Sequence, residues 1–400
     1  MQRIYSKKLI FEKGDSAPLN ELRLLTLQES DIVQKIREYF PINQYGNLDD
    51  LLLIKGSKML LTELENINNL SKKMDISMPL SDIEYIGLSD NNELILRFIS
   101  DDITATGTYK FKEDFLEIFK LSSFGNYCIR NGHRDILQEN LAKLLTRLGK
   151  EKKQFRLLFH NEKFILRGLT SEHYNNYDNN LLLYTVFLEL HKFSKEENVN
   201  FYIDKAYISD SDINISLEQE QVIPLDNIGN VQLGIQLINN EIRDSAVSIQ
   251  LRYKVSDNEG NAFIGVSTLK DSLINFNHIA KFDTAISKIK SISNLKEAEF
   301  EVLEFIRNIH DTPELTINSL YEVMKKVVNS KKTFSTETRT QAEKVYNDLR
   351  DNTVSLIKAF GRMGEISDNV DETTIIERIL HEVLWEQTKS NKVITNSNFQ

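Results

Sequence analysis

The sequence contains little cysteine, proline or tryptophan. Its 400 residues include one cysteine, Cys128, five prolines and one tryptophan. A single cysteine excludes an intramolecular disulfide and a zinc site built from several thiolates, and it fits a reducing compartment. With 40% apolar residues and few prolines, the chain is expected to form hydrophobic cores rather than to be disordered.

Long apolar runs and an excess of positive charge are also missing. No apolar run approaches 18 residues, so we predict no transmembrane helix and no membrane partner. The start, MQRIYSKKLIFEKGDS, is basic but has no apolar centre and no small-residue cleavage site, and we interpret it as a first strand rather than a signal peptide. The net charge of −10 argues against generic nucleic-acid binding over the whole surface, while a local basic patch remains possible.

The pattern of apolar residues predicts an α+β protein with an antiparallel, β-rich centre. At this length we expect two or three domains. Consecutive strands with short links favour antiparallel pairing over βαβ units. The predicted regions are a mixed α/β N-terminal unit (1–150), a β-rich core with a hairpin and one helix (151–275), an all-helical C-terminal region (276–391) and a polar tail (392–400).

The spacing of apolar residues also predicts individual elements. Expected strands are Arg3–Phe11, Ile83–Leu88, Glu93–Ile99, Thr104–Phe111, Asn200–Ile208, Asp212–Leu217, Val231–Asn239, Val247–Val255 and Ala262–Val266. Expected helices are Glu29–Phe40, Ser57–Lys73, Asp135–Leu148, Leu181–Phe193, Asn277–Ser291, Leu295–Ile309, Thr316–Asn329, Glu337–Leu349, Val354–Phe360 and Glu372–Thr388.

A basic segment at the start of the β-rich region is the strongest functional feature. Between Leu141 and Arg167 there are eight basic and two acidic residues, and two apolar runs around Asn161-Glu162 predict a hairpin. Basic and aromatic side chains interleaved on a sheet suit single-stranded nucleic acid, with phosphates on Lys and Arg and bases stacked on rings. The alternative is a solvated charged face with buried phenylalanines. The candidate phosphate ligands are Lys150, Lys152, Lys153, Arg156, Lys163 and Arg167.

A polar tract, Ser171–Asp178, follows the hairpin. Its Tyr174 and Tyr177 are the candidate residues for stacking on bases, since functional loops are often polar and aromatic. The alternative is an ordinary turn in which Asp178 or Asn179 caps the next helix.

Other motifs are weak. Asp210-Ser211-Asp212 has oxygen ligands for a hard cation but is more typical of a turn. Glu151-Lys152-Lys153 has the letters of a nuclease motif without its strand context. Gly56-Ser57-Lys58 lacks the first glycine of a phosphate loop, and Gly229 and Gly234 do not form a dinucleotide-binding fingerprint. We therefore expect a non-enzymatic protein without catalytic residues, metal or cofactor.

Two segments carry a resemblance to a known family. They resemble sequence motifs of the phage/plasmid-like protein family of unknown function, which is found in prophages, phages and conjugative plasmids. The first segment is Leu166–Tyr174 with Tyr177-Asp178-Asn179, and the second is Asn239-Asn240-Glu241 with Ser245. Asn352-Thr353 is also family-like, whereas the Cys-x-Asn-Gly usual in the family is absent. The likeness is patchy over residues 154–360. It implies a mobile-element origin and an α+β core, and no activity.

Three functions follow as hypotheses. The first is a mobile-element protein of the bacterial cytoplasm that binds single-stranded nucleic acid, for example in annealing, and self-assembles into a homo-oligomer so that its basic patches line up. The second is a phage protein that binds a host protein, as a defence antagonist or trigger. The third is a virion or assembly component.

Overall fold

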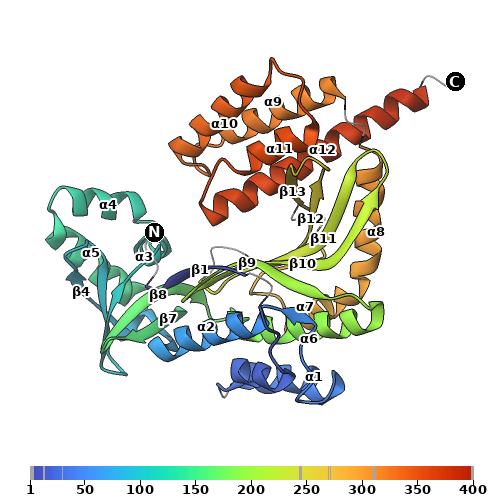
Figure 1. Cartoon of the computed structure of the whole chain (residues 1–400). Coiled ribbons are helices and arrows are strands. Elements are labelled where there is room, and N and C mark those ends of the chain that lie inside the picture. The colour runs from blue at the N-terminus through green and yellow to red at the C-terminus, as the bar shows by residue number, and fades with distance from the viewer. Residues whose placement is uncertain are drawn as a thin grey trace.

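The protein has an α+β fold, as predicted. The computed structural model describes residues 4–11, 14–28, 30–242, 246–268, 270, 272–309 and 312–397. These residues form a larger and a smaller sheet, with helices packed on both (Figure 1). Among them, no helix combines the length and apolar content needed to cross a membrane.

The larger sheet is the centre of the molecule. Its main strands, in spatial order, are β1 (Ser6–Ile10), β9 (Phe201–Ser209), β10 (Asp212–Leu225), β11 (Gly229–Asn240), β12 (Val247–Ser256) and β13 (Ala262–Val266). They pair antiparallel, as predicted for the β-rich region. Two short strands join this sheet: β14 (Ile274–Phe276) pairs with β12, and β2 (Ile54–Lys55) runs parallel to β9.

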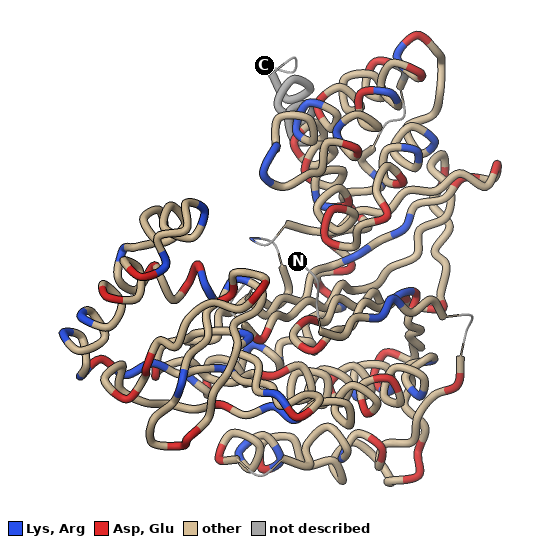
Figure 2. Tube along the Cα trace, turned by 90° about the vertical axis from the view of Figure 1, so that its left-hand side faces the viewer, with Lys and Arg blue, Asp and Glu red and all other residues tan. Residues whose placement is uncertain are grey.

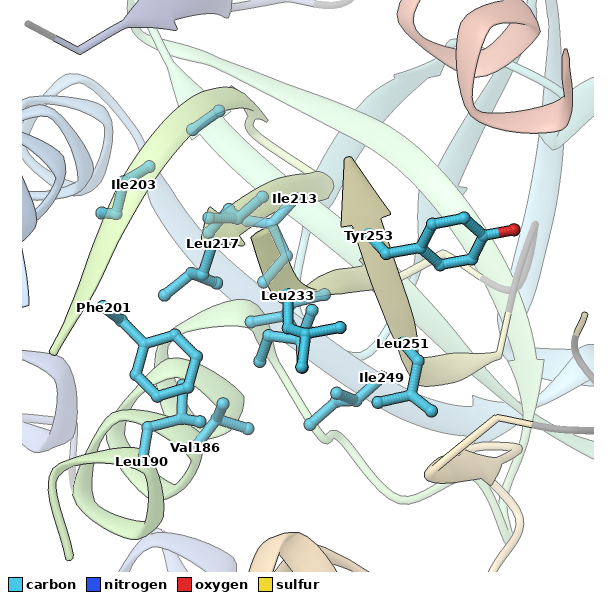
Figure 3. Packing of buried hydrophobic residues seen from close by; sticks show 14 of the residues in the cluster. Val186, Leu190, Phe201, Ile203, Ile213, Leu217, Leu233, Ile249, Leu251 and Tyr253 are labelled. Carbon is cyan, nitrogen blue, oxygen red and sulfur yellow. The ribbon is translucent and has the colours of Figure 1, made fainter. Parts of the chain in front are cut away.

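One long helix supports the apolar face of the larger sheet. Helix α6 (Asn179–Glu197) is buried along almost its whole length, which is typical of a helix surrounded by other elements. In Figure 3, Val186 and Leu190 of α6 lie beside Phe201 of β9. Further helices enclose this layer: α1 (Asp31–Tyr39), α2 (Ser57–Leu70), α7 (Phe282–Lys290) and α8 (Leu295–Arg307).

The smaller sheet combines strands from two predicted regions. Its order is β3 (Lys72–Pro79), β7 (Lys152–His160), β8 (Lys163–Ser171), β6 (Ile103–Gly107), β5 (Leu94–Phe98) and β4 (Ile83–Leu88). Strands β7 and β8 form the predicted hairpin, and both Asn161 and Glu162 have positive φ, as in a type I′ turn. This sheet has its own core, to which three helices contribute: α3 (Phe111–Ile118), α4 (Ser122–Arg130) and α5 (Arg134–Arg147).

The last part of the chain is helical, as predicted. Helices α9 (Pro313–Asn329), α10 (Thr336–Leu349), α11 (Leu356–Gly364) and α12 (Val370–Ser397) lie together above β12 and β13 (Figure 1). Thr312, Ser335 and Ser355 cap α9, α10 and α11 through their hydroxyl oxygens.

Several elements differ from the predictions. Lys72–Pro79 is a strand, although its first residues were assigned to the preceding helix; α4 and β14 were not predicted. Since β7 and β8 pair with β3 and β6, the predicted domain boundary at residue 150 falls inside the smaller sheet. Helix α12 continues through Ser397, into the predicted tail. Arg3, Glu29, Ser245 and 398–400 lie outside the described residues.

Candidate functional site

The exposed lysines of the predicted basic segment do not converge. Lys150, Lys152 and Lys163 are exposed. Lys152 begins β7, where it pairs with Pro79 of β3, and His160 at the other end of β7 pairs with Lys163 of β8. Eight residues of strand therefore separate Lys152 from Lys163, roughly 25 Å. Lys153 is partly covered and lies 2.6 Å from the Glu151 carboxylate. Basic and acidic positions are interspersed along the trace in Figure 2.

The two arginines of the hairpin are buried, so their assignment to phosphates was wrong. Arg156 is 0% and Arg167 1% exposed. Arg156 donates to the carboxylates of Asp75 (3.0 Å) and Asp178 (2.7 Å) and to the backbone carbonyl of Glu241 (2.7 Å). A phosphate in solution cannot reach a guanidinium group enclosed in this way.

Glu241 is the centre of this buried ion-pair network. Its carboxylate accepts hydrogen bonds from Arg167 (2.7 Å), Lys73 (2.6 Å) and the backbone N–H of Asn179 (2.9 Å). Burial by itself raises the pKa of Glu241, but the positive charges of Lys73, Arg167 and Arg156 outweigh it and hold the pKa far below its usual range. The carboxylate is therefore ionised, and the network joins strands of both sheets.

The two tyrosines predicted to stack on bases are also buried, which corrects that assignment. Tyr174 is 8% and Tyr177 3% exposed. The ring of Tyr174 already stacks on His278, with centroids 4.7 Å apart, and its hydroxyl donates to the carbonyl of Glu241. The hydroxyl of Tyr177 donates to the carbonyl of Ala280. In this arrangement neither ring offers a face to a base.

The polar tract is thus a turn into α6, as its alternative interpretation predicted, but the expected cap is absent. Asp178 occupies the N-cap position without a side-chain capping bond, because its carboxylate pairs with Arg156. The two segments that carry the family resemblance meet here: Asn239 donates to the carbonyl of Tyr177 and to the amide oxygen of Asn179. They form the joint between the sheets.

The other weak motifs also have structural roles. Asp210 and Ser211 are buried in the turn between β9 and β10, where Asp210 accepts a 2.5 Å hydrogen bond from Tyr109. Cys128 is a buried free thiol. Within the described ranges, no group of three or more His, Cys, Asp or Glu side chains is arranged for a metal ion.

The best candidate site lies on the opposite, polar face of the larger sheet. A cleft of about 460 Å³ separates this face from α11 and α12, and we call it the sheet–helix cleft. Its volume falls within the range of about 300–1,000 Å³ typical of ligand sites. The sheet side carries Lys8, Lys205, Tyr207, Asn214, Ser216 and Lys254, and the helix side carries Glu365, Ser367, Asp368, Thr373, Thr374 and Glu377.

Strand alternation places the lysines in this cleft. In β1, Leu9 is buried while Lys8 and Ile10 are exposed, and in β9 the apolar Ala206 lies between Lys205 and Tyr207. Because successive side chains point to opposite faces, the lysines face the cleft while the apolar residues face α6. Lys8 of β1 pairs in register with Tyr207 of the adjacent strand β9, and Tyr207 lies two residues after Lys205.

The floor of the cleft is a preformed hydrogen-bond network. Asn214 donates to Thr374 of α12 (3.1 Å), and Ser216 donates to Gln236 (2.8 Å). Both Asn214 and Ser216 are buried. Buried polar groups held by partners on two elements keep their orientation, so the floor presents fixed polar atoms to a ligand.

Glu377 is the most informative residue of the cleft. It is 3% exposed, and its Oε1 accepts a hydrogen bond from Lys205 at 3.2 Å. Its Oε2 is buried and has no hydrogen-bond partner in the described part of the chain. An unsatisfied buried carboxylate oxygen is costly, and a ligand with an N–H or O–H group would satisfy it. Lysines near a free acceptor suit a ligand with both an anionic group and a donor.

Sequence reasoning did not identify this cleft. The signal is present in β10, β11 and β12, where apolar residues alternate with a polar series, for example Asn214, Ser216 and Glu218. Such alternation predicts a sheet with one polar face. It does not predict that α12, over a hundred residues later, covers that face.

Comparison of the chain with protein-family models, with curated proteins and with solved structures gave no match.

Proposed function

We propose that this protein is a mobile-element nucleic-acid-binding protein and that a single strand binds in the sheet–helix cleft. The observation that carries the proposal is the combination of Lys8, Lys205 and Lys254 on one wall with the unsatisfied Oε2 of Glu377 opposite them. The family resemblance supports the mobile-element origin.

The chemistry of a nucleotide matches both features. Its phosphate is the anionic group that lysine ammonium groups bind, and its base amino groups or sugar hydroxyls are the donors that Glu377 needs. Tyr207 lines the same wall, and an aromatic ring beside a lysine is typical of single-strand binding surfaces. Several copies of the chain in one oligomer would place several clefts along one strand, which would compensate for the small number of lysines in each.

The test is fluorescence anisotropy with labelled single-stranded DNA over a series of salt concentrations. The cleft variant replaces Lys8, Lys205 and Lys254 by Gln. A matched control replaces Lys150, Lys152 and Lys163, which are exposed on the smaller-sheet unit, so both variants lose three positive charges. We expect the cleft variant to bind weakly, with a slope of log K against log salt lower by about 2, since each phosphate contact to a single strand contributes about 0.7.

A second cleft variant protects the test against misfolding. Lys205 pairs with the buried Glu377, so its loss removes that ion pair, whereas Lys8 and Lys254 form no ion pair among the described residues. The Lys8→Gln/Lys254→Gln protein should fold normally and still lose affinity. Equal losses in the cleft and control variants would assign binding to general electrostatics, and no binding at low salt would reject the proposal.

A second candidate function, binding of a host protein, is favoured by a separate surface. This surface is an apolar groove between α8 and α12, whose Trp385 lies about two helical turns along α12 from Glu377.

A further inference from the structure

Helix α8 exposes a large aromatic side chain beside an aromatic groove. Phe300 is 61% exposed, although the opposite side of the helix, with Val302, Phe305 and Ile306, is buried. A cavity of about 310 Å³ lies next to Phe300 and is lined by Phe305, Asn308, Trp385 and Thr388 together with Glu301 and Glu304. We call it the α8–α12 groove.

The aromatic floor of the groove is held in place by packing. The rings of Phe305 and Trp385 are 4.9 Å apart, and Trp385 also stacks on His381, at 5.8 Å and 20° between planes. Rings fixed in this way need no rearrangement to receive an apolar side chain, and preformed aromatic pockets are typical hot spots of protein interfaces.

The rim of the groove is acidic. Glu301 and Glu304 line it, and Glu297 is exposed one turn before Phe300. Glu304 is paired with Arg307, but Glu301 and Glu297 have no ion-pair partner within the described ranges. Lys326 of α9 pairs with both Glu382 and Glu386 of α12. On the α8 side of the groove, three exposed carboxylates, Glu297, Glu301 and Glu304, therefore have one ion-pair partner among the described residues, Arg307.

We propose that the α8–α12 groove binds an amphipathic helix of a partner protein, with an apolar residue on Phe305 and Trp385 and Lys or Arg residues facing the glutamates. A helix laid in an apolar groove is a common mode of peptide recognition, and the acidic rim selects a basic partner through charge complementarity. A second copy of this chain, which carries a net charge of −10, is the less complementary occupant.

The chain supplies its own probe for this proposal. Trp385 is the sole tryptophan and lines the groove, so intrinsic tryptophan fluorescence reports on this site alone. The probe ligand is a short helix-forming peptide of leucine and lysine, titrated into the full chain. A peptide with the same leucines and glutamate in place of lysine is its matched control. We expect the lysine peptide to shift the emission of Trp385 saturably and the glutamate peptide to leave it unchanged.

Variants identify the surface. Phe300→Ala should weaken binding about tenfold or more, as for an aromatic hot spot, and Glu301→Gln/Glu304→Gln should weaken it about three- to tenfold, as for two partly exposed charge pairs. Asp135→Asn/Glu139→Gln on α5 removes two exposed charges elsewhere and should change nothing. All these positions are exposed, so the variants should fold.

Three results would overturn the proposal. They are an unchanged emission of Trp385 on addition of the lysine peptide, equal binding of the lysine and glutamate peptides, and a loss of affinity in the α5 control variant equal to that in the groove variants. Sedimentation of the free chain tests the other occupant: a dimer that Phe300→Ala dissociates would show that the groove binds a second copy.

Discussion

Arg167 and Glu241 form a salt bridge of 2.7 Å with both side chains at 0% exposure. Arg167 belongs to β8 of the smaller sheet, and Glu241 follows β11 of the larger one. The pair therefore fixes the two sheets relative to each other. Two buried charges lose their hydration and are stable only with close partners. Glu241 also pairs with Lys73, and Arg167 also donates to the backbone carbonyl of Asp210.

Replacing Glu241 by Gln should destabilise the protein strongly. The change leaves Arg167 and Lys73 without their shared carboxylate, and loss of one partner of a buried pair costs about 3–5 kcal/mol. Urea denaturation followed by circular dichroism measures this. Glu139→Gln on the exposed face of α5 is the control and should cost less than about 0.5 kcal/mol.

The double variant Glu241→Gln/Arg167→Met separates pairing from packing. If the cost of the single change comes from the unpaired charge, removal of Arg167 should recover part of it. A double variant that loses the full sum of the two single losses would contradict this explanation.

These contacts show how far the sequence could be interpreted. The strands β11 to β13 were predicted closely because alternating apolar residues define both their limits and their buried face. The prediction for β10 ended at Leu217, whereas the strand continues to Leu225 beyond an irregularity after Glu218. The hairpin was also predicted, since Asn161-Glu162 is a clear turn. The burial of Arg156 and Arg167 was not predictable, because Asp75 and Glu241 lie 81 and 74 residues away from them. An arginine in a strand has the same local pattern whether it faces solvent or a distant carboxylate.

The strand β3 was missed for a different reason. Lys72 and Lys73 lie just beyond the end of α2 at Leu70, and Met74, four residues after Leu70, continues a helical spacing of apolar residues. Their strand conformation comes from pairing with β7, in which Lys73 lies opposite Leu158. Tertiary pairing overrides local preference in such segments, and this also explains why the predicted boundary at residue 150 divides a sheet.

Helix α11 packs so closely on β13 at Gly361 that a side chain at this position should destabilise the protein. A Cβ there would lie 2.4 Å from the carbonyl oxygen of Ala262, and backbone cannot move away cheaply. Gly361→Ala should therefore destabilise by about 1–3 kcal/mol and, because Gly361 lines the sheet–helix cleft, weaken binding of single-stranded DNA.

Gly364 provides the matched control for this test. It ends the same helix, and a Cβ there meets only Leu380 at 3.8 Å, an ordinary contact. Both changes add a methyl group to α11, so any general gain in helix propensity is shared. Thermal denaturation should show a loss for Gly361→Ala and none for Gly364→Ala. Equal melting temperatures would mean that α11 does not need its close approach to β13.

Glu299 should make the protein less stable as pH rises. It lies in α8 at 4% exposure, where the side-chain amide of Gln219 donates to it. Burial raises the pKa of its carboxyl to about 7, and the nearby Lys296 and the hydrogen bond from Gln219 offset only part of this effect. An unfolded glutamate has a pKa of about 4.3, so between these values the folded chain holds a proton that the unfolded chain has released.

The extra proton held by the folded chain determines how stability changes with pH. The stability linked to Glu299 is complete below about pH 4.3 and is lost as pH rises through 7. Glu299→Gln keeps a neutral hydrogen-bonding group at every pH, so the variant should match the wild type near pH 4.5 and exceed its stability by roughly 1–3 kcal/mol at pH 8.5. Urea denaturation at both pH values measures this difference. Glu297→Gln, exposed on the same helix, should show no such pH dependence, and a difference for Glu299→Gln that stays constant with pH would mean that this carboxyl is ionised in the folded protein throughout the range.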